Sequence, residues 1–221
     1  MKKVVITGGV GSGKSRVLKY LTDNCNCKVV RADDVASLLM EPGKRCYFDI
    51  IDAFSDEELV DKTAKTKHRE DGTYNVASDK EGAVPYPPFD KARLSSLIFA
   101  NDNNRLKVNS IVHPAVKEYV LSDVEKEEKR ALYDYYFFEV ALAIEEGYDN
   151  IFDETWFIYA DRSTRCERLK QSRGYSDDKI DSIMASQLSD EEYRTHSTVT
   201  INNDGNVEDL YDNISHILHC D

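Results

Sequence analysis

A glycine-rich segment near the amino end constrains the fold more than any other part of this sequence. It follows the apolar run Val4-Val5-Ile6, and residues 8–15 read Gly-Gly-Val-Gly-Ser-Gly-Lys-Ser. Glycines adopt positive φ and let backbone N–H groups close around phosphate oxygens, while a helix beginning near Lys14 points its positive end at the same anion. Every fixed position of a phosphate-binding P-loop is filled, directly after a strand. We therefore predict a P-loop that binds a nucleoside triphosphate.

Two side chains of this loop can act on the triphosphate itself. The Lys14 ammonium can reach the β- and γ-phosphates, and the Ser15 hydroxyl can ligate Mg²⁺, directly or through water. The alternative is a glycine-rich strand-to-helix turn that binds nothing, which the complete spacing disfavours.

Composition and charge exclude several classes of protein. The 221 residues carry a net charge of −12, whereas nonspecific nucleic-acid binding needs a basic face. No apolar run approaches the ~20 residues of a membrane span, and the run at the amino end is too short for a signal peptide. The scattered cysteines lack the spacing of a zinc site. We expect a cytosolic chain that binds neither nucleic acid nor membrane.

Apolar runs alternate with amphipathic stretches along most of the chain, which is typical of a mostly parallel sheet covered by helices. The expected strands are residues 4–6, 28–30, 131–138, 155–159 and 198–201. The expected helices are residues 14–23, 33–40, 46–54, 162–171, 177–187 and 207–218. The pattern predicts a three-layer α/β/α fold like that of P-loop nucleoside-triphosphate hydrolases, with a mostly parallel five-stranded sheet.

Residues 61–129 interrupt this alternation and predict an insertion. Residues 61–90 carry turn residues and few apolar ones, so we expect a long loop or a small irregular subdomain. Residues 91–129 show helical spacing, and we expect two or three helices, broken at residues 101–104 and near His113-Pro114. The chain would then be one domain, with a core of about residues 1–60 and 130–221, this helical insertion, and a lid at about residues 165–190.

An acidic residue, Asp33, follows the second expected strand. Ligands of open parallel sheets bind beyond the carboxyl ends of the strands, and we expect this strand to lie beside the P-loop strand. The Asp33 carboxylate could then accept a proton from an attacking hydroxyl or orient Mg²⁺. Equally, it could only cap the next helix, a role that Asp favours.

Arginines follow the fourth expected strand. Arg162, Arg165 and Arg168 recur at spacings of three, near one helix face, and Arg173 comes next. Guanidinium groups on a lid could stabilise the charge that builds on a transferring phosphoryl group. A solvated basic face is the alternative. Glu139, at the end of the third strand, could organise Mg²⁺ through water or merely pair with a basic residue.

Taken in order, these motifs resemble the dephospho-CoA kinase family along nearly the whole chain. The resemblance rests on residues 7–15, 31–36, 89–94, 98–101, 112–114, 140–145 and 201–205, together with the arginine-rich lid and Gln187. It implies ATP-dependent phosphorylation of the ribose 3′-hydroxyl of dephospho-CoA, the last step of coenzyme A synthesis. The chain departs from the family's usual Asp, Arg, Pro and Gln at Arg31, Lys91, Ala141 and Arg165, respectively.

The same resemblance implies roles for individual residues. Asp33 would act as the base toward the 3′-hydroxyl, with Lys14 and Arg168 as the other catalytic residues. The implied ATP-binding residues are Gly8, Gly9, Gly11, Ser12, Gly13, Lys14, Ser15, Arg16, Arg168, Arg173, Asn203 and Gly205. The implied substrate-binding residues are Asp33, Lys91, His113 and Glu139, with the helical insertion holding the CoA side. Mg²⁺ would accompany ATP at Ser15, in a monomer or weak homo-oligomer.

Two other functions remain open at this point. A nucleoside or ribosylnicotinamide kinase would share the P-loop, the strand-end carboxylate and the lid, with a different acceptor pocket. A P-loop switch protein that binds partners according to its nucleotide is less favoured, because the sequence has no Asn-Lys-x-Asp segment to recognise a guanine base.

Overall fold

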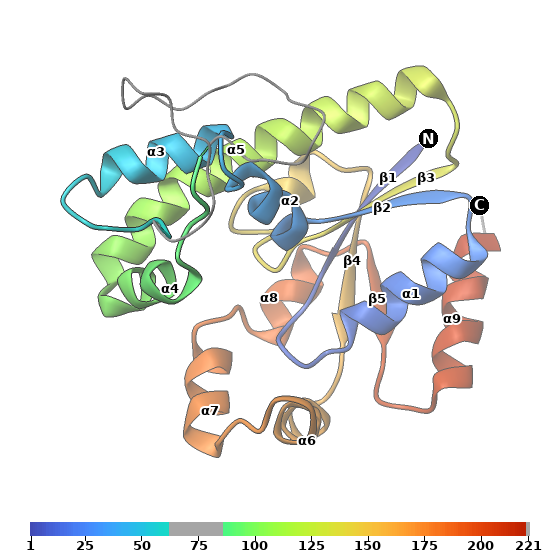
Figure 1. The fold of residues 1–221 in the computed structure, drawn as a ribbon. Coiled ribbons are helices and arrows are strands. Elements are labelled where there is room, and N and C mark those ends of the chain that lie inside the picture. The colour runs from blue at the N-terminus through green and yellow to red at the C-terminus, as the bar shows by residue number, and fades with distance from the viewer. Residues whose placement is uncertain (62–85, 220–221) are drawn as a thin grey trace. The chain divides into compact units, whose positions relative to one another are not determined.

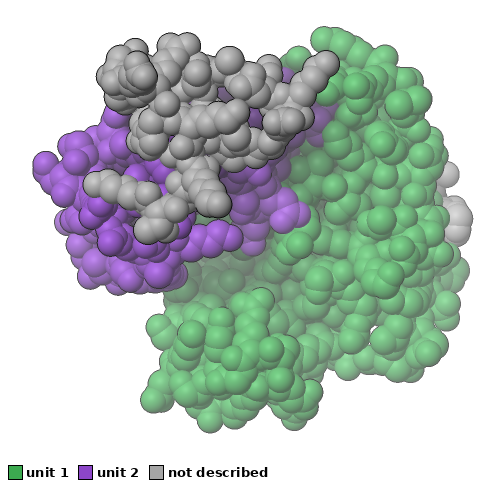
Figure 2. Space-filling model, in the orientation of Figure 1, with its two compact units in different colours: residues 1–32, 124–221 green, residues 33–123 purple. Residues whose placement is uncertain are grey.

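The computed structural model describes residues 1–61 and 86–219 of the chain. By their contacts the residues divide into two compact units, drawn in two colours in Figure 2. Unit 1 comprises residues 1–32 and 124–221, and unit 2 comprises residues 33–123. None of the described helices is both long enough and apolar enough to span a membrane. The division into core, insertion and lid stays a prediction.

Unit 1 is built on a parallel sheet (Figure 1). Its strands are β1 (Lys2–Thr7), β2 (Cys27–Arg31), β3 (Tyr135–Glu139), β4 (Glu154–Tyr159) and β5 (Val199–Asn202), in the order β2-β3-β1-β4-β5. Each of the four pairings between these strands is parallel. The predicted α/β fold and its five strands are confirmed.

The sheet order corrects one expectation about the site. We expected the strand before Asp33 to lie beside the P-loop strand, but β3 lies between β2 and β1. The acidic residue at the carboxyl end of the strand beside β1 is therefore Glu139, which is in register with Ile6. Strand order depends on crossovers between distant segments, and the local patterns used here do not contain it.

Helices α1 (Lys14–Asn24) and α9 (Val207–His219) cover one face of the sheet. They lie side by side, and the rings of Tyr20 and Tyr211 stack with centroids 4.5 Å apart (Figure 1). Their buried leucines and isoleucines pack with alternate strand residues such as Ile6 and Trp156 in one core cluster. This packing fixes the start of α1, and therefore the P-loop, at the carboxyl end of β1, the middle strand of the sheet.

Aromatic rings pack on the second face of the sheet. Phe138 of β3 packs against Tyr148, in the short helix η1 (Tyr148–Asn150), with centroids 5.0 Å apart. Phe157 of β4 stacks on Tyr193, in α8 (Asp190–Thr195), at 4.9 Å. Burial raises the pKa of both tyrosines to about 12. Unit 1 thus has the predicted three layers.

The remaining helices of unit 1 are α6 (Arg162–Arg173) and α7 (Asp177–Ala185), which carry the predicted lid residues. Helix α6 ends at Gly174, which has φ 62°. Helix α8 was not predicted, although its start carries a recognisable signal. Ser189 and Glu192 form a capping box, with each side chain accepting from the other residue's backbone N–H.

Unit 2 holds α2 (Ala32–Leu39), α3 (Arg45–Ala53), α4 (Lys91–Ala100) and most of α5 (Asp102–Arg130). The predicted break near residues 101–104 is confirmed, because Asn101 ends α4 and its side chain accepts from the Asn104 N–H. The predicted break at His113-Pro114 is wrong, since α5 continues through Pro114. The buried Val112, Ala115 and Val116 hold both flanks of the proline in the helix.

Residues 62–85, which make up most of the predicted irregular segment, lie outside the described residues. Just beyond their two ends, Val60 and Phe89 form an antiparallel bridge.

Candidate nucleotide-binding site

The P-loop connects β1 to α1 and leaves the amino end of the helix open. Gly11 and Gly13 have φ of 79° and 88°, which only glycine adopts readily. Gly13 is the N-cap of α1, and no side chain caps the helix there. The amino end of α1 therefore presents backbone N–H groups that no side chain caps, which is the arrangement that binds phosphate.

The Lys14 side chain folds back over the loop. Its Nζ donates to the carbonyl oxygen of Gly8 at 2.6 Å and contacts that of Gly9 at 3.5 Å. Ser15 and Arg16 follow on the exposed surface of the first turn of α1, so the Ser15 hydroxyl is accessible to a cation. Among the described residues, no group of three or more His, Cys, Asp or Glu side chains could hold a metal ion.

Asn203 joins the end of β5 to the P-loop. Its side chain is buried, and its Nδ2 donates to the Ser12 carbonyl oxygen at 2.7 Å. Its backbone N–H donates to the Tyr159 carbonyl oxygen at 2.8 Å. A Cβ on Gly13 would lie only 2.2 Å from the Asn203 Nδ2, so this contact itself requires glycine at that position. The predicted ATP-binding residue Asn203 thus lies against the loop.

Arg168 of α6 also reaches the P-loop, where its guanidinium group donates to backbone carbonyl oxygens. Its Nη1 donates to the Ser12 carbonyl oxygen at 3.3 Å, and its Nη2 donates to that of Asn203 at 2.7 Å. Burial and the nearby charge of Arg16 lower the pKa of Arg168. The guanidinium group therefore links α6, the P-loop and the segment that follows β5.

The opposite side of the loop meets Arg165 and Gln187. The Oε1 of Gln187 accepts from the Val10 N–H at 2.9 Å, and the Arg165 guanidinium packs on Gly9. Neither residue was among the predicted ATP-binding residues, although Arg165 was named with the lid arginines and Gln187 belongs to the motifs that carry the family resemblance. The spacing of three between Arg165 and Arg168 was the signal that both reach the same place.

Glu139 and Arg31 end adjacent strands and face each other. The Oε2 of Glu139 lies 3.6 Å from the Nε of Arg31, and the glutamate side chain is 12% exposed. Two other predicted ATP-binding residues, Arg173 and Gly205, make no contact with the P-loop among the described residues. Arg173 is exposed at the end of α6, 5.8 Å from the ring of Tyr175, and Gly205 is exposed next to Asp209.

The other predicted substrate-side residues belong to unit 2. Asp33 is exposed in the first turn of α2, where a carboxylate interacts favourably with the helix dipole. Lys91 is the exposed first residue of α4, whose N-cap is Asp90. His113 is half-buried in the middle of α5.

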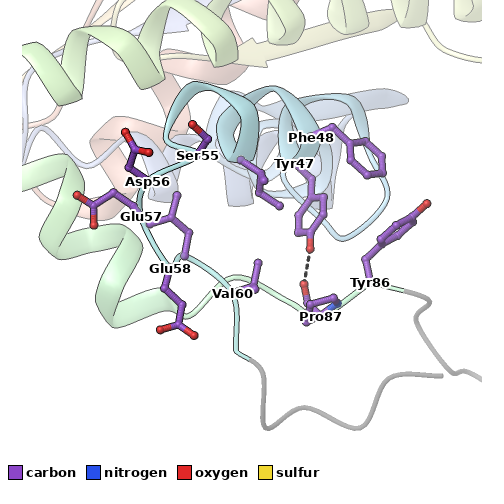
Figure 3. A pocket seen from close by; sticks show the side chains of 11 residues that line it. Tyr47, Phe48, Ser55, Asp56, Glu57, Glu58, Val60, Tyr86 and Pro87 are labelled. Atoms are coloured by element: carbon purple, nitrogen blue, oxygen red, sulfur yellow. Dashed lines mark hydrogen bonds between the residues drawn. The ribbon is translucent and has the colours of Figure 1, made fainter. Parts of the chain in front are cut away.

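Unit 2 also contains a cavity of about 440 Å³ beside the carboxyl end of α3 (Figure 3). Tyr47, Phe48 and Tyr86 line one part of it, and the Tyr47 hydroxyl donates to the Pro87 carbonyl oxygen at 2.7 Å. Asp56, Glu57 and Glu58 line another part. The described lining contains no lysine or arginine, so these residues suit an apolar or cationic group better than a phosphate.

Known proteins of one family match this chain in sequence. The family model described as dephospho-CoA kinase matches residues 3–81 and 87–209. A dephospho-CoA kinase from Geobacter sulfurreducens is 29% identical over 218 residues, covering 98% of this chain and 97% of that protein. A dephospho-CoA kinase from Shouchella clausii is 27% identical over 209 residues, covering 95% and 93%.

Solved structures show the same fold. The protein TT1252 from Thermus thermophilus has a TM-score of 0.72 at 22% identity, covering 98% of this chain and 96% of that chain. A dephospho-CoA kinase from Campylobacter jejuni has a TM-score of 0.67 at 19% identity, covering 99% and 96%. Since the family model matches most of the chain around an intact P-loop, this chain belongs to the dephospho-CoA kinase family, the ATP-dependent kinases that phosphorylate dephospho-CoA in coenzyme A biosynthesis.

Proposed function

We propose that this enzyme transfers the γ-phosphoryl group of ATP to the ribose 3′-hydroxyl of dephospho-CoA, with the residues assigned below. The observation that carries the proposal is the open amino end of α1 behind Gly13, next to Lys14, in a chain whose family phosphorylates that substrate. An uncapped helix end and a lysine are suited to hold the β- and γ-phosphates of ATP.

In this proposal Lys14 exchanges partners when ATP binds. Its ammonium leaves the carbonyl oxygens of Gly8 and Gly9 and follows the β- and γ-phosphates, where it offsets developing negative charge. The exposed Ser15 hydroxyl would hold Mg²⁺, which neutralises phosphate charge when bound. Arg168 and Asn203 keep the carbonyl oxygen of Ser12 turned away from the phosphates, so that the N–H groups face them.

Asp33 is the proposed base. Its carboxylate would accept the proton of the 3′-hydroxyl as the oxygen attacks the γ-phosphorus, and ADP leaves with the bridging oxygen. The support is its place in the sequence, two residues after the carboxyl end of β2, and its exposed position at the start of α2. Lys91, His113 and Glu139 are the proposed contacts to dephospho-CoA.

The proposed partners are ATP and dephospho-CoA alone, in a cytosolic monomer or weak homo-oligomer that binds no nucleic acid. The net charge of −12 supports this, because the phosphate backbone of a nucleic acid would be repelled by most of the surface.

A coupled ADP-release assay tests the proposed function. Purified protein receives ATP and Mg²⁺ with dephospho-CoA, adenosine or ribosylnicotinamide as acceptor, and the Lys14→Ala variant serves as the control. We expect ADP release with dephospho-CoA, and a product whose mass and phosphorus spectrum identify a ribose 3′-phosphate. ADP release with a nucleoside and none with dephospho-CoA would contradict the proposal.

A further inference from the structure

Arg165 differs from the other arginines of α6 in its burial. The residue is only 9% exposed, whereas the side chain of Arg162, one turn earlier, is 56% exposed and pairs with Asp181 at 2.6 Å. Arginine is rarely buried unless its charge is paired, because moving a cation out of water costs free energy. Arg165 is therefore not simply part of a solvated basic face of α6, and its burial needs another explanation.

The buried guanidinium group lies against the first half of the P-loop. A Cβ on Gly9 would be 2.0 Å from the Arg165 Nη1, and one on Gly11 would be 2.9 Å from its backbone oxygen. Gln187, which accepts from the Val10 N–H, would be 3.4 Å from the same Gly9 Cβ. Arg165 and Gln187 thus enclose Gly9 and Val10, and the glycines are required by the arginine packed on them.

The protein only partly neutralises this charge. The Nε of Arg165 is buried and has no hydrogen-bond partner among the described residues. A carboxylate oxygen of Asp190 lies 3.7 Å from the Nη2, beyond hydrogen-bond distance, on a side chain that is 36% exposed. Lys14 and Arg168 add two more cations at the same loop. Such a cluster is stabilised by a polyanion.

We propose that Arg165 is a positioning residue for the triphosphate. It holds Gly9 and Val10 in the shape that receives phosphates, and it supplies a poorly solvated positive charge that bound ATP neutralises. The inference rests on the proposed function only in taking the P-loop as the ATP site, and it does not depend on the acceptor. It adds a residue of this chain that was not among the predicted ATP-binding residues.

The test separates charge from packing. ATP, ADP and AMP are titrated calorimetrically into wild-type protein with Mg²⁺ and no acceptor, and into Arg165→Met, Arg165→Gln and Arg165→Lys. Arg162→Met is the matched control, because it removes the same charge from an exposed position of the same helix. Emission from Trp156, buried in β4, verifies that each variant is folded.

We expect the two neutral variants to lose about 10-fold to 100-fold in ATP affinity, as removal of a charge-assisted contact predicts, with a smaller loss for AMP. Arg165→Lys should regain most of the ATP affinity, and Arg162→Met should bind ATP like wild type. In turnover, the KM for ATP should rise in the neutral variants more than kcat falls.

The inference would be overturned if the folded neutral variants bound ATP as tightly as Arg162→Met. It would also be overturned if Arg165→Lys lost as much ATP affinity as the neutral variants, because that result indicates a role in packing alone. If Arg165→Met does not fold, Arg165→Gln gives the neutral comparison. If neither neutral variant folds, a folded Arg165→Lys variant that binds ATP weakly also refutes the inference. If the wild-type protein binds ATP but does not phosphorylate dephospho-CoA, the proposed function is contradicted, and the ATP titrations still test the role of Arg165.

Discussion

Gly13→Ala is the substitution whose cost can be worked out most directly from the structure. Gly13 has φ 88°, and an added Cβ would lie 2.2 Å from the Nδ2 of Asn203. Gly174, at the end of α6, also has positive φ, at 62°, but no atom lies within 4 Å of the Cβ position there. The two glycines therefore share the backbone strain and differ only in the contact.

Left-handed backbone costs an alanine about 1–2 kcal/mol, and this applies at both positions. At Gly13 the new methyl group must also displace the Asn203 amide, breaking its buried hydrogen bond to the Ser12 carbonyl oxygen. Loss of such a bond costs about 1–3 kcal/mol. We expect Gly174→Ala to lower the free energy of unfolding by about 1–2 kcal/mol and Gly13→Ala by about 2–5 kcal/mol.

Urea unfolding followed by Trp156 emission measures this difference. Trp156 is the only tryptophan of the chain, is 1% exposed, and lies in β4 beside the P-loop strand, so it reports on unit 1. In an Asn203→Ala background the extra cost of Gly13→Ala should disappear, because no amide is left to displace. Equal destabilisation by Gly13→Ala and Gly174→Ala, in the presence of Asn203, would refute the reasoning.

Three further outcomes are expected. Asp33→Asn should lower kcat by about 100-fold or more with little change in ATP affinity, whereas the control Asp34→Asn should leave kcat unchanged. Equal activity of Asp33→Asn and wild type would show that Asp33 is not the base and only stabilises the start of its helix. Lys14→Ala should weaken ATP binding more than AMP binding in titrations without acceptor, and equal effects on both would argue against a β/γ-phosphate contact. Stability should fall above pH 10, because Tyr148 and Tyr193 stay protonated in the folded state up to a pKa of about 12 but ionise near 10 when unfolded. Each tyrosine contributes up to about 1.4 kcal/mol per pH unit to the loss of unfolding free energy in that window. Urea midpoints measured at several pH values should therefore decline less steeply with pH in Tyr193→Phe than in wild type. An unchanged slope in that variant would contradict the assignment.

Local signals in the sequence were sufficient for the parts of the fold that local physics determines. The glycine spacing places the start of α1 at Lys14, as observed, and short apolar runs locate all five strands. The third strand begins at Tyr135 rather than at residue 131, because Ala131 has φ 50° and ends the preceding helix. The contact of Asn203 with the P-loop agrees with its predicted place in the site.

Long-range features could not be predicted in this way. The position of β3 between β1 and β2 depends on crossovers, so Glu139 rather than Asp33 ends the strand next to the P-loop strand. Helix α5 continues through Pro114 because buried neighbours outweigh the lost hydrogen bond. The burial of Arg165 depends on how α6 packs on Gly9 and Gly11, which spacing alone does not determine.

The Ser12 carbonyl oxygen accepts from Asn203 and Arg168, which lie 191 and 156 residues further along the chain. During synthesis, a nascent polypeptide that stops short of β5 lacks the amide that anchors its own amino-terminal turn. Capacity to hold ATP should therefore arise late, when the last strand joins the sheet, and truncated translation products should not compete with the finished enzyme for nucleotide.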